Sequence, residues 1–135
     1  MKTKLTVIAL LIVVILALGA MSVYAERATL TVQTISAATP ITPVYVTPVA
    51  DGHSFANDGN QFVHIKNATG STVYITITTP ATIGGMAIAD VNTAIATGTE
   101  RMIGPFDPTY FNNSGGTVYV DYSATGVTVG AFKLP

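Results

Sequence analysis

The chain of 135 residues contains neither cysteine nor tryptophan, and only 10% of its residues are charged. Without cysteine it has no disulfide crosslink and no thiolate nucleophile. Six basic side chains stand against seven acidic ones, and the basic residues do not cluster, so no surface is suited to neutralise a phosphate backbone. The sequence therefore predicts no nucleic-acid partner and a fold stabilised by its hydrophobic core.

One long run lacks charge altogether: the 21 residues from position 5 to position 25 follow two lysines near the start of the chain. A positive head, an apolar centre and a small-residue end, with Val23 and Ala25 at the cleavage positions, are typical of a secretory signal peptide. As a helix the same run would span roughly 30 Å, which is enough to cross a membrane. We interpret residues 1–25 as a signal peptide, with an uncleaved membrane anchor through residues 5–25 as the alternative. Either way we expect an exported chain, located extracellularly or at the cell surface.

Cleavage after Ala25 would leave 110 residues with four basic and seven acidic side chains, and so a formal charge of −3. That length fits one domain with a modest core. Abundant threonine and valine, with little charge, are typical of β-strands. We predict an N-terminal strand and proline-punctuated linker over residues 26–49, followed by a β-sandwich domain over residues 50–135.

Short alternating runs separated by glycine, proline, asparagine and aspartate are typical of β-sandwiches and barrels. The predicted strands are residues 28–35, 61–67, 71–79, 86–96, 101–103, 117–123 and 127–134. Pro40, Pro43 and Pro48 make residues 41–49 an extended edge or linker, because proline lacks a backbone donor. We expect hairpins joining 61–67 to 71–79 and 117–123 to 127–134. The predicted fold class is an all-β antiparallel β-sandwich, immunoglobulin-like or jelly-roll, preceded by one N-terminal hydrophobic helix.

Side chains suited to catalysis or to metal binding are few and scattered. His53 and His64 with Asp58 would suit a metal site, but His53 and Asp58 are typical turn residues, and His64 fits a half-buried strand position. The acidic residues are isolated near turns, and no serine lies in a Gly-x-Ser-x-Gly turn. We therefore predict a protein that is not an enzyme, with no catalytic residue, no cofactor and no metal ion.

One loop near residue 105 concentrates three aromatic side chains, Phe106, Tyr110 and Phe111, which we expect to plug one end of the core. Arg101 directly precedes this loop. We expect its guanidinium to tie the loop down, by stacking on Phe106 or Tyr110 or by pairing with Asp107, with ligand binding as the alternative role.

Two asparagines, Asn67 and Asn112, fit the N-glycosylation acceptor pattern and fall in predicted loops. The pattern is compatible with export and is common by chance. Three tyrosines, Tyr45, Tyr110 and Tyr119, offer aromatic rings on which a sugar could stack. They make a glycan a candidate partner.

Three segments resemble a family of small β-sandwich proteins encoded by tailed bacteriophages and prophages, whose members look like virion surface or decoration proteins. They are residues 55–67 (FANDGNQFVHIKN), residues 100–106 (ERMIGPF) with Phe111 and Asn112 following, and residues 118–129. The resemblance covers roughly residues 50–130 and implies that the matched residues form turns and core. The leader departs from this pattern, because capsid proteins of tailed phages assemble in the cytoplasm. Together, the resemblance and the leader imply a domain reused on a cell surface, or a virus that contains a membrane.

The strand at residues 28–35 suggests how copies would join. Its Leu30, Val32 and Ile35 would form a subunit-interface strand if the segment adds to the sheet of a neighbouring copy, and the alternative is pairing within its own domain. We predict a homo-oligomeric structural subunit of an extracellular filament or cell-surface assembly. The alternatives are a virion surface or decoration protein and a glycan-binding surface module.

Overall fold

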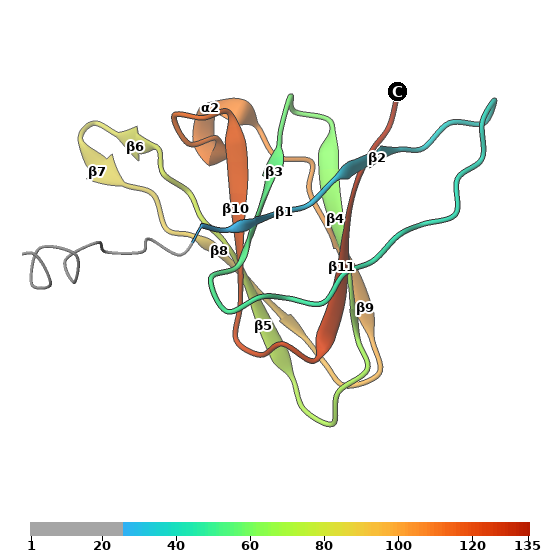
Figure 1. Cartoon of the computed structure of the whole chain (residues 1–135). Coiled ribbons are helices and arrows are strands. Elements are labelled where there is room, and N and C mark those ends of the chain that lie inside the picture. The colour runs from blue at the N-terminus through green and yellow to red at the C-terminus, as the bar shows by residue number, and fades with distance from the viewer. Residues whose placement is uncertain (1–25) are drawn as a thin grey trace, which may run out of the picture.

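The computed structural model describes residues 26–135, so the predicted signal peptide or anchor lies outside the described residues. The alternating runs form strands that are grouped in two main sheets and one small arm (Figure 1). The first sheet has the order β1 (Ala28–Thr29), β3 (His53–Ala56), β10 (Thr117–Tyr122), β5 (Val73–Ile77), β8 (Val91–Ile95). The second has the order β2 (Val32–Thr34), β11 (Val127–Lys133), β4 (Gln61–Asn67), β9 (Glu100–Ile103). The arm pairs β6 (Thr82–Ile83) with β7 (Met86–Ala87).

The prediction of an all-β fold is confirmed for this part of the chain, whose one helix, α2 (Pro108–Phe111), is a single turn. No helix between residues 26 and 135 has the length and apolar character needed to cross a membrane. The expectation of purely antiparallel sheets is wrong, because β1 pairs with β3, and β2 with β11, in parallel. Both parallel pairs involve the N-terminal segment.

The two predicted hairpins are wrong. β4 and β5 lie in different sheets, and so do β10 and β11. Val63 of β4 and Val73 of β5 are each fully buried because the two strands face each other across the core. A two-residue alternation tells which face of a strand is buried, but it does not tell whether the next strand lies beside that strand or opposite it.

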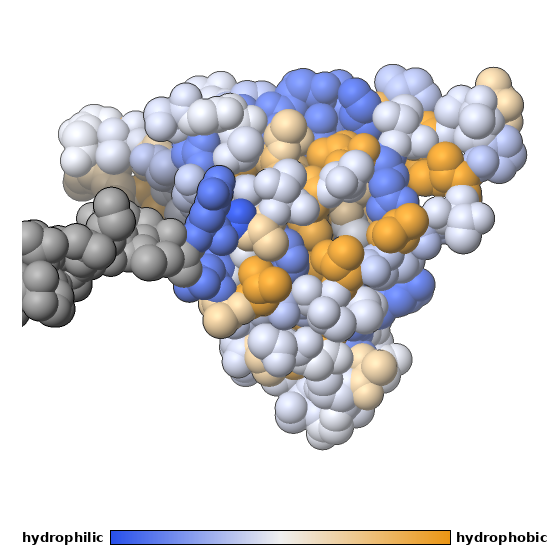
Figure 2. All heavy atoms as spheres, viewed as in Figure 1, coloured by the Kyte–Doolittle hydropathy of each residue, from blue (hydrophilic) through white to orange (hydrophobic). Residues whose placement is uncertain are grey.

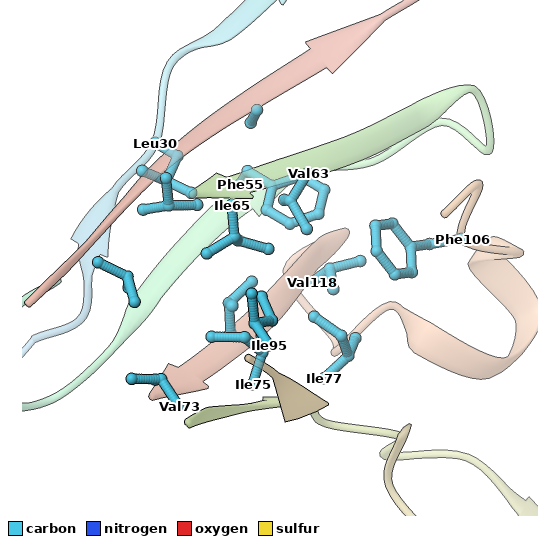
Figure 3. Close-up of a cluster of buried hydrophobic side chains, with 14 residues drawn as sticks. Leu30, Phe55, Val63, Ile65, Val73, Ile75, Ile77, Ile95, Phe106 and Val118 are labelled. Atoms are coloured by element: carbon cyan, nitrogen blue, oxygen red, sulfur yellow. The ribbon is translucent and has the colours of Figure 1, made fainter. Parts of the chain in front are cut away.

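A single hydrophobic core fills the space between the two main sheets. Figure 3 shows Val63 and Ile65 of β4 pointing toward Ile75 of β5 and Val118 of β10. These four side chains are 0% exposed. Fully burying a side chain of this size contributes about 1.5–3 kcal/mol, so the paired faces account for much of the fold's stability without any disulfide.

The aromatic loop closes one end of this core, as predicted for two of its three rings. Phe106 is 2% exposed and contacts Phe55, with 5.7 Å between ring centroids, and Phe111 packs edge-on against Phe106. Tyr110 is 41% exposed and faces outward from α2. Asp107 caps this turn by accepting a hydrogen bond from the Thr109 backbone N–H at 2.8 Å.

The predicted strand over residues 86–96 divides into β7 and β8. Between β5 and β8 the chain leaves the sheet as the β6–β7 arm, which projects from the body on one side (Figure 1). The Asp90 carboxylate closes the base of the arm by accepting a hydrogen bond from the Thr79 backbone N–H at 2.7 Å. The chain therefore spends about ten residues on a projection that adds nothing to either main sheet.

Candidate subunit-assembly surface

The N-terminal segment, predicted as one strand, is divided between the two main sheets. β1 forms the outer edge of one sheet and β2 the outer edge of the other. Leu30 lies between them, and its side chain is 4% exposed within the common core. Leu30 also donates its backbone N–H to the Ser54 carbonyl at 2.8 Å. The segment crosses from sheet to sheet at the point where its one leucine enters the core.

The three predicted interface residues therefore have different environments. Leu30 is part of the core, Val32 is half-buried against it, and Ile35 is 38% exposed while its N–H bonds the Lys133 carbonyl. In this single chain the segment pairs within its own domain, which is the alternative that the sequence left open. Its use between subunits stays a prediction.

Arg27 holds the start of this segment. Its guanidinium forms two hydrogen bonds with the Asp121 carboxylate, one of them Nη2 to Oδ2 at 3.0 Å, and it lies over the Tyr119 ring at 4.5 Å from the centroid. The two side chains are 26% and 41% exposed, so solvent screens the pair and limits its contribution to about 1 kcal/mol. Gly52 makes the approach possible, because a Cβ there would meet Asp121 Oδ1 at 2.5 Å.

The sequence assigned such a tie to the wrong arginine. Arg101 lies on β9, is exposed, and donates to the carbonyl of its neighbour Glu100 at 3.0 Å. Its described contacts include neither the expected stacking on Phe106 or Tyr110 nor a pair with Asp107. The Arg101 side chain lies on the outer strand of its sheet and is exposed, whereas Arg27 reaches across its own sheet to Asp121 on β10.

The linker after β2 runs back along β11 as an extended chain. The Gln33 side chain takes the role of a strand partner here, because its amide donates to the Val44 carbonyl and accepts from the Val44 N–H, both at 2.8 Å. Two residues on, Val46 exchanges two backbone hydrogen bonds of 2.9 Å with Val129. The linker therefore covers the part of the β11 edge that β2 leaves unpaired.

Tyr45 points from the linker onto the outer face of the second sheet. Its ring packs at 5.6 Å from His64 and 5.8 Å from Phe132, between centroids, and Lys66 lies over it at 4.2 Å. Gly130 permits this contact, because a Cβ there would lie 2.9 Å from a linker carbonyl. The linker thus buries an outward-facing histidine that would otherwise be exposed.

An apolar groove of about 310 Å³ remains where the N-terminal segment and the linker meet β11. Its lining carries no charge: Thr29, Leu30, Thr31, Gln33, Val44, Val46, Val129, Gly130 and Ala131. Figure 2 shows hydrophobic side chains gathered on this face of the molecule. The large hydrophobic residues exposed along the linker are Ile35, Ile41, Val44, Val46 and Val49. Exposed apolar surface of this extent is typical of an interaction site.

The two histidines belong to separate sheets, each with its own tyrosine. His53 is a strand residue, 2% exposed, and not the turn residue predicted; its Nδ1 lies 3.1 Å from the Tyr122 hydroxyl. Burial lowers the pKa of His53 and raises the pKa of Tyr122. His64 Nδ1 lies 2.8 Å from the Tyr45 hydroxyl. Among residues 26–135 no three histidine, aspartate or glutamate side chains are grouped to hold a metal ion.

Both predicted glycosylation acceptors have structural roles. Asn67 is 2% exposed, and its amide nitrogen donates to the carbonyls of Ser71 and Ile95, each at 2.8 Å. A glycan on that nitrogen would have no space in the folded chain. Asn112 is partly buried. Its side-chain oxygen accepts from the Asn57 side-chain amide and its amide nitrogen donates to the Asn57 backbone carbonyl, so this nitrogen is engaged as well.

The three tyrosines proposed for sugar stacking do not form one platform. Tyr45 lies against the second sheet under Lys66, whereas Tyr119 lies on β10 under Arg27. Each therefore has a cation over one face of its ring. Tyr110 is exposed on α2 and belongs to the loop at the end of the core.

The resemblance to phage decoration proteins stays a prediction from the residues. No protein-family model, no curated protein and no solved structure matches this chain.

Proposed function

We propose that the protein is a non-enzymatic structural subunit of an extracellular filament or cell-surface assembly, in which neighbouring copies exchange residues 28–34. Leu30 carries this proposal. It fills the core from a segment whose strand pairings to the body are short and parallel, of two and three residues. The same contacts are available to the segment of a second copy, so exchange would replace them one for one.

The linker has the length that exchange requires. Residues 35–45 separate β2 from the point where the chain returns to β11, and they extend away from the body at the side opposite the β6–β7 arm (Figure 1). Fully extended, these eleven residues reach roughly 36 Å, which exceeds the radius of a domain of this size. Prolines at positions 40 and 43 favour the extended form. A neighbouring copy therefore lies within reach.

For the fold we propose a jelly roll in preference to an immunoglobulin-like sandwich. Successive strands β3, β4 and β5 alternate between the two sheets, and so do β9, β10 and β11. In an immunoglobulin domain the last two strands are neighbours in one sheet. Jelly rolls occur in viral capsids and in lectins, so this strand order alone does not assign a function.

Cysteine pairs test the exchange directly, because the chain has no cysteine of its own. Thr29 and Ser54 are register partners across β1 and β3. Neighbouring strands lie about 4.8 Å apart, within the Cα separation that a disulfide spans. We would coexpress full chains carrying Thr29→Cys with differently tagged chains carrying Ser54→Cys, and oxidise the exported material. Exchange predicts covalent dimers that contain both tags.

A matched pair within the body serves as the control. Ala56 and Thr117 are register partners across β3 and β10, outside the exchanged segment. Coexpressed Ala56→Cys and Thr117→Cys chains should give no mixed dimer. If the Thr29→Cys and Ser54→Cys mixture also gives none, while the double variant closes a disulfide within one chain, exchange is wrong. Electron microscopy of the same material separates filaments and surface layers from virions.

A further inference from the structure

The β6–β7 arm forms a sheet of its own two strands, and the hydrogen bond between Thr79 and Asp90 closes its base. All four of its strand residues are exposed, and the tip presents Ile83 and Met86, which are 61% and 73% exposed. An isolated two-stranded hairpin is at best marginally stable in water. An ordered arm with two large apolar side chains at its tip is therefore suited to packing against another surface.

The turn at the tip leaves these side chains unobstructed. Gly84 and Gly85 have φ angles of +59° and +81°, which glycine adopts readily, and a Cβ on either would meet nothing within 4 Å. The chain carries no charge from residue 67 to residue 89, so the whole arm is uncharged. It can enter an apolar surface without burying a charge.

The groove beside Leu30 and Val44 is a receptor of matching character. It is also uncharged, and its volume of about 310 Å³ is about twice that of an apolar cavity known to hold a benzene ring. Two aliphatic side chains fit such a space. The arm projects from the body at the side opposite the linker (Figure 1), whereas the groove is lined by the N-terminal segment, the linker and β11, so we take the arm of another copy as its occupant.

We propose that the β6–β7 arm of one copy docks into the groove of the next, with Ile83 and Met86 as the inserted side chains. Copies that each carry a charge of −3 over residues 26–135 repel one another, so contact through two uncharged surfaces is favoured. Because arm and groove are different surfaces, the contact is heterologous and repeats along an open filament or layer. Thr29, Leu30, Thr31 and Gln33 of the groove belong to the segment proposed to exchange, so the two proposals share this segment. The docking contact itself is made by the β6–β7 arm, which strand exchange does not use.

Complementary variants test this docking. Met86→Asp disables the arm and leaves the groove intact, whereas Val44→Asp disables the groove and leaves the arm intact. Both residues are exposed, at 73% and 63%, so neither change disturbs the core. Met102→Asp is the matched control, because Met102 is 69% exposed on β9, away from both surfaces. Sedimentation velocity of the exported full chains gives the size distribution of each variant and of their mixtures.

We expect the wild type and Met102→Asp to form extended oligomers, and each docking variant alone to associate at least about tenfold more weakly. An equimolar mixture of the two docking variants should form larger species than either variant alone, because each variant keeps the docking surface that the other lacks. A Met86→Asp size distribution equal to that of the wild type, or a loss of oligomers in Met102→Asp instead, overturns the arm-to-groove contact. Mixed disulfides from the Thr29 and Ser54 variants would then still support strand exchange.

Discussion

Replacing Leu30 with alanine should destabilise the protein more than any other change in the N-terminal segment. Leu30 is 4% exposed, and truncating a buried leucine costs about 2–5 kcal/mol. The neighbouring groove lets the site relax partly, so we expect about 3 kcal/mol. With an unfolding entropy of about 2.1 cal/mol/K per residue over 110 residues, the melting temperature should fall by about 13 °C.

Thermal unfolding followed by circular dichroism measures this shift, with Ile35→Ala as the control because Ile35 is 38% exposed. The control should melt within about 4 °C of the wild type. A Leu30→Ala chain that melts within about 2 °C of the wild type would refute the placement of Leu30 in the core. If copies exchange the segment, the melting temperature should also rise with protein concentration, since association stabilises the folded form.

Three further changes test the surroundings of this segment. Gly52→Ala should lower the free energy of unfolding by more than about 2 kcal/mol, because φ is +71° and the new Cβ would meet Asp121. The control Gly98→Ala, with φ +69° in open space, should lower it by only about 1–2 kcal/mol. Urea unfolding measures both free energies. Asn67→Ala should lower the free energy of unfolding by about 1–3 kcal/mol in the same measurement, because the buried Ile95 carbonyl loses this donor, whereas the exposed Ser71 carbonyl keeps the Thr69 hydroxyl. Burial lowers the pKa of His53, so as the pH drops the unfolded chain binds a proton at this histidine before the folded chain does, and stability should fall below about pH 6.5. The variant His53→Asn should remove that part of the pH dependence of the melting temperature.

The local pattern of the sequence predicted elements better than it predicted partners. The strand at Gln61–Asn67 was expected with these bounds, and the turn at residues 57–60 lies where Asn, Asp and Gly occur together. The strands that pair with β4 were not predictable, because the alternation of apolar and polar residues indicates only which face of a strand is buried. Both β4 and β5 bury one face in the same core. Asn67, the last residue of β4, helps to hold the connection from β4 to β5. Its side-chain amide donates to the Ser71 carbonyl within that connection and to the Ile95 carbonyl at the end of β8.

The candidate surface was predictable only in part. Leu30 stood out as an apolar residue among threonines, but nothing local indicated that the strand would break beside it and serve both sheets. Arg27 was missed because its partner, Asp121, is 94 positions away in the sequence. The arm was missed for a different reason: Gly84 and Gly85 indicated a turn, while the exposure of Ile83 and Met86 depends on where β5 and β8 lie.

The scarcity of charge, which first excluded a nucleic-acid partner, also determines how assembly should respond to salt. Backbone pairing and apolar docking form the proposed contacts, and the Arg27–Asp121 pair at the start of the segment is partly exposed and weak. Raising NaCl from about 20 mM to about 500 mM screens the repulsion between copies, so sedimentation should show equal or larger oligomers. Ammonium sulfate should enlarge them further, because it strengthens apolar burial. Dissociation by NaCl would mean that ion pairs hold the copies together, and both proposed contacts would then be wrong.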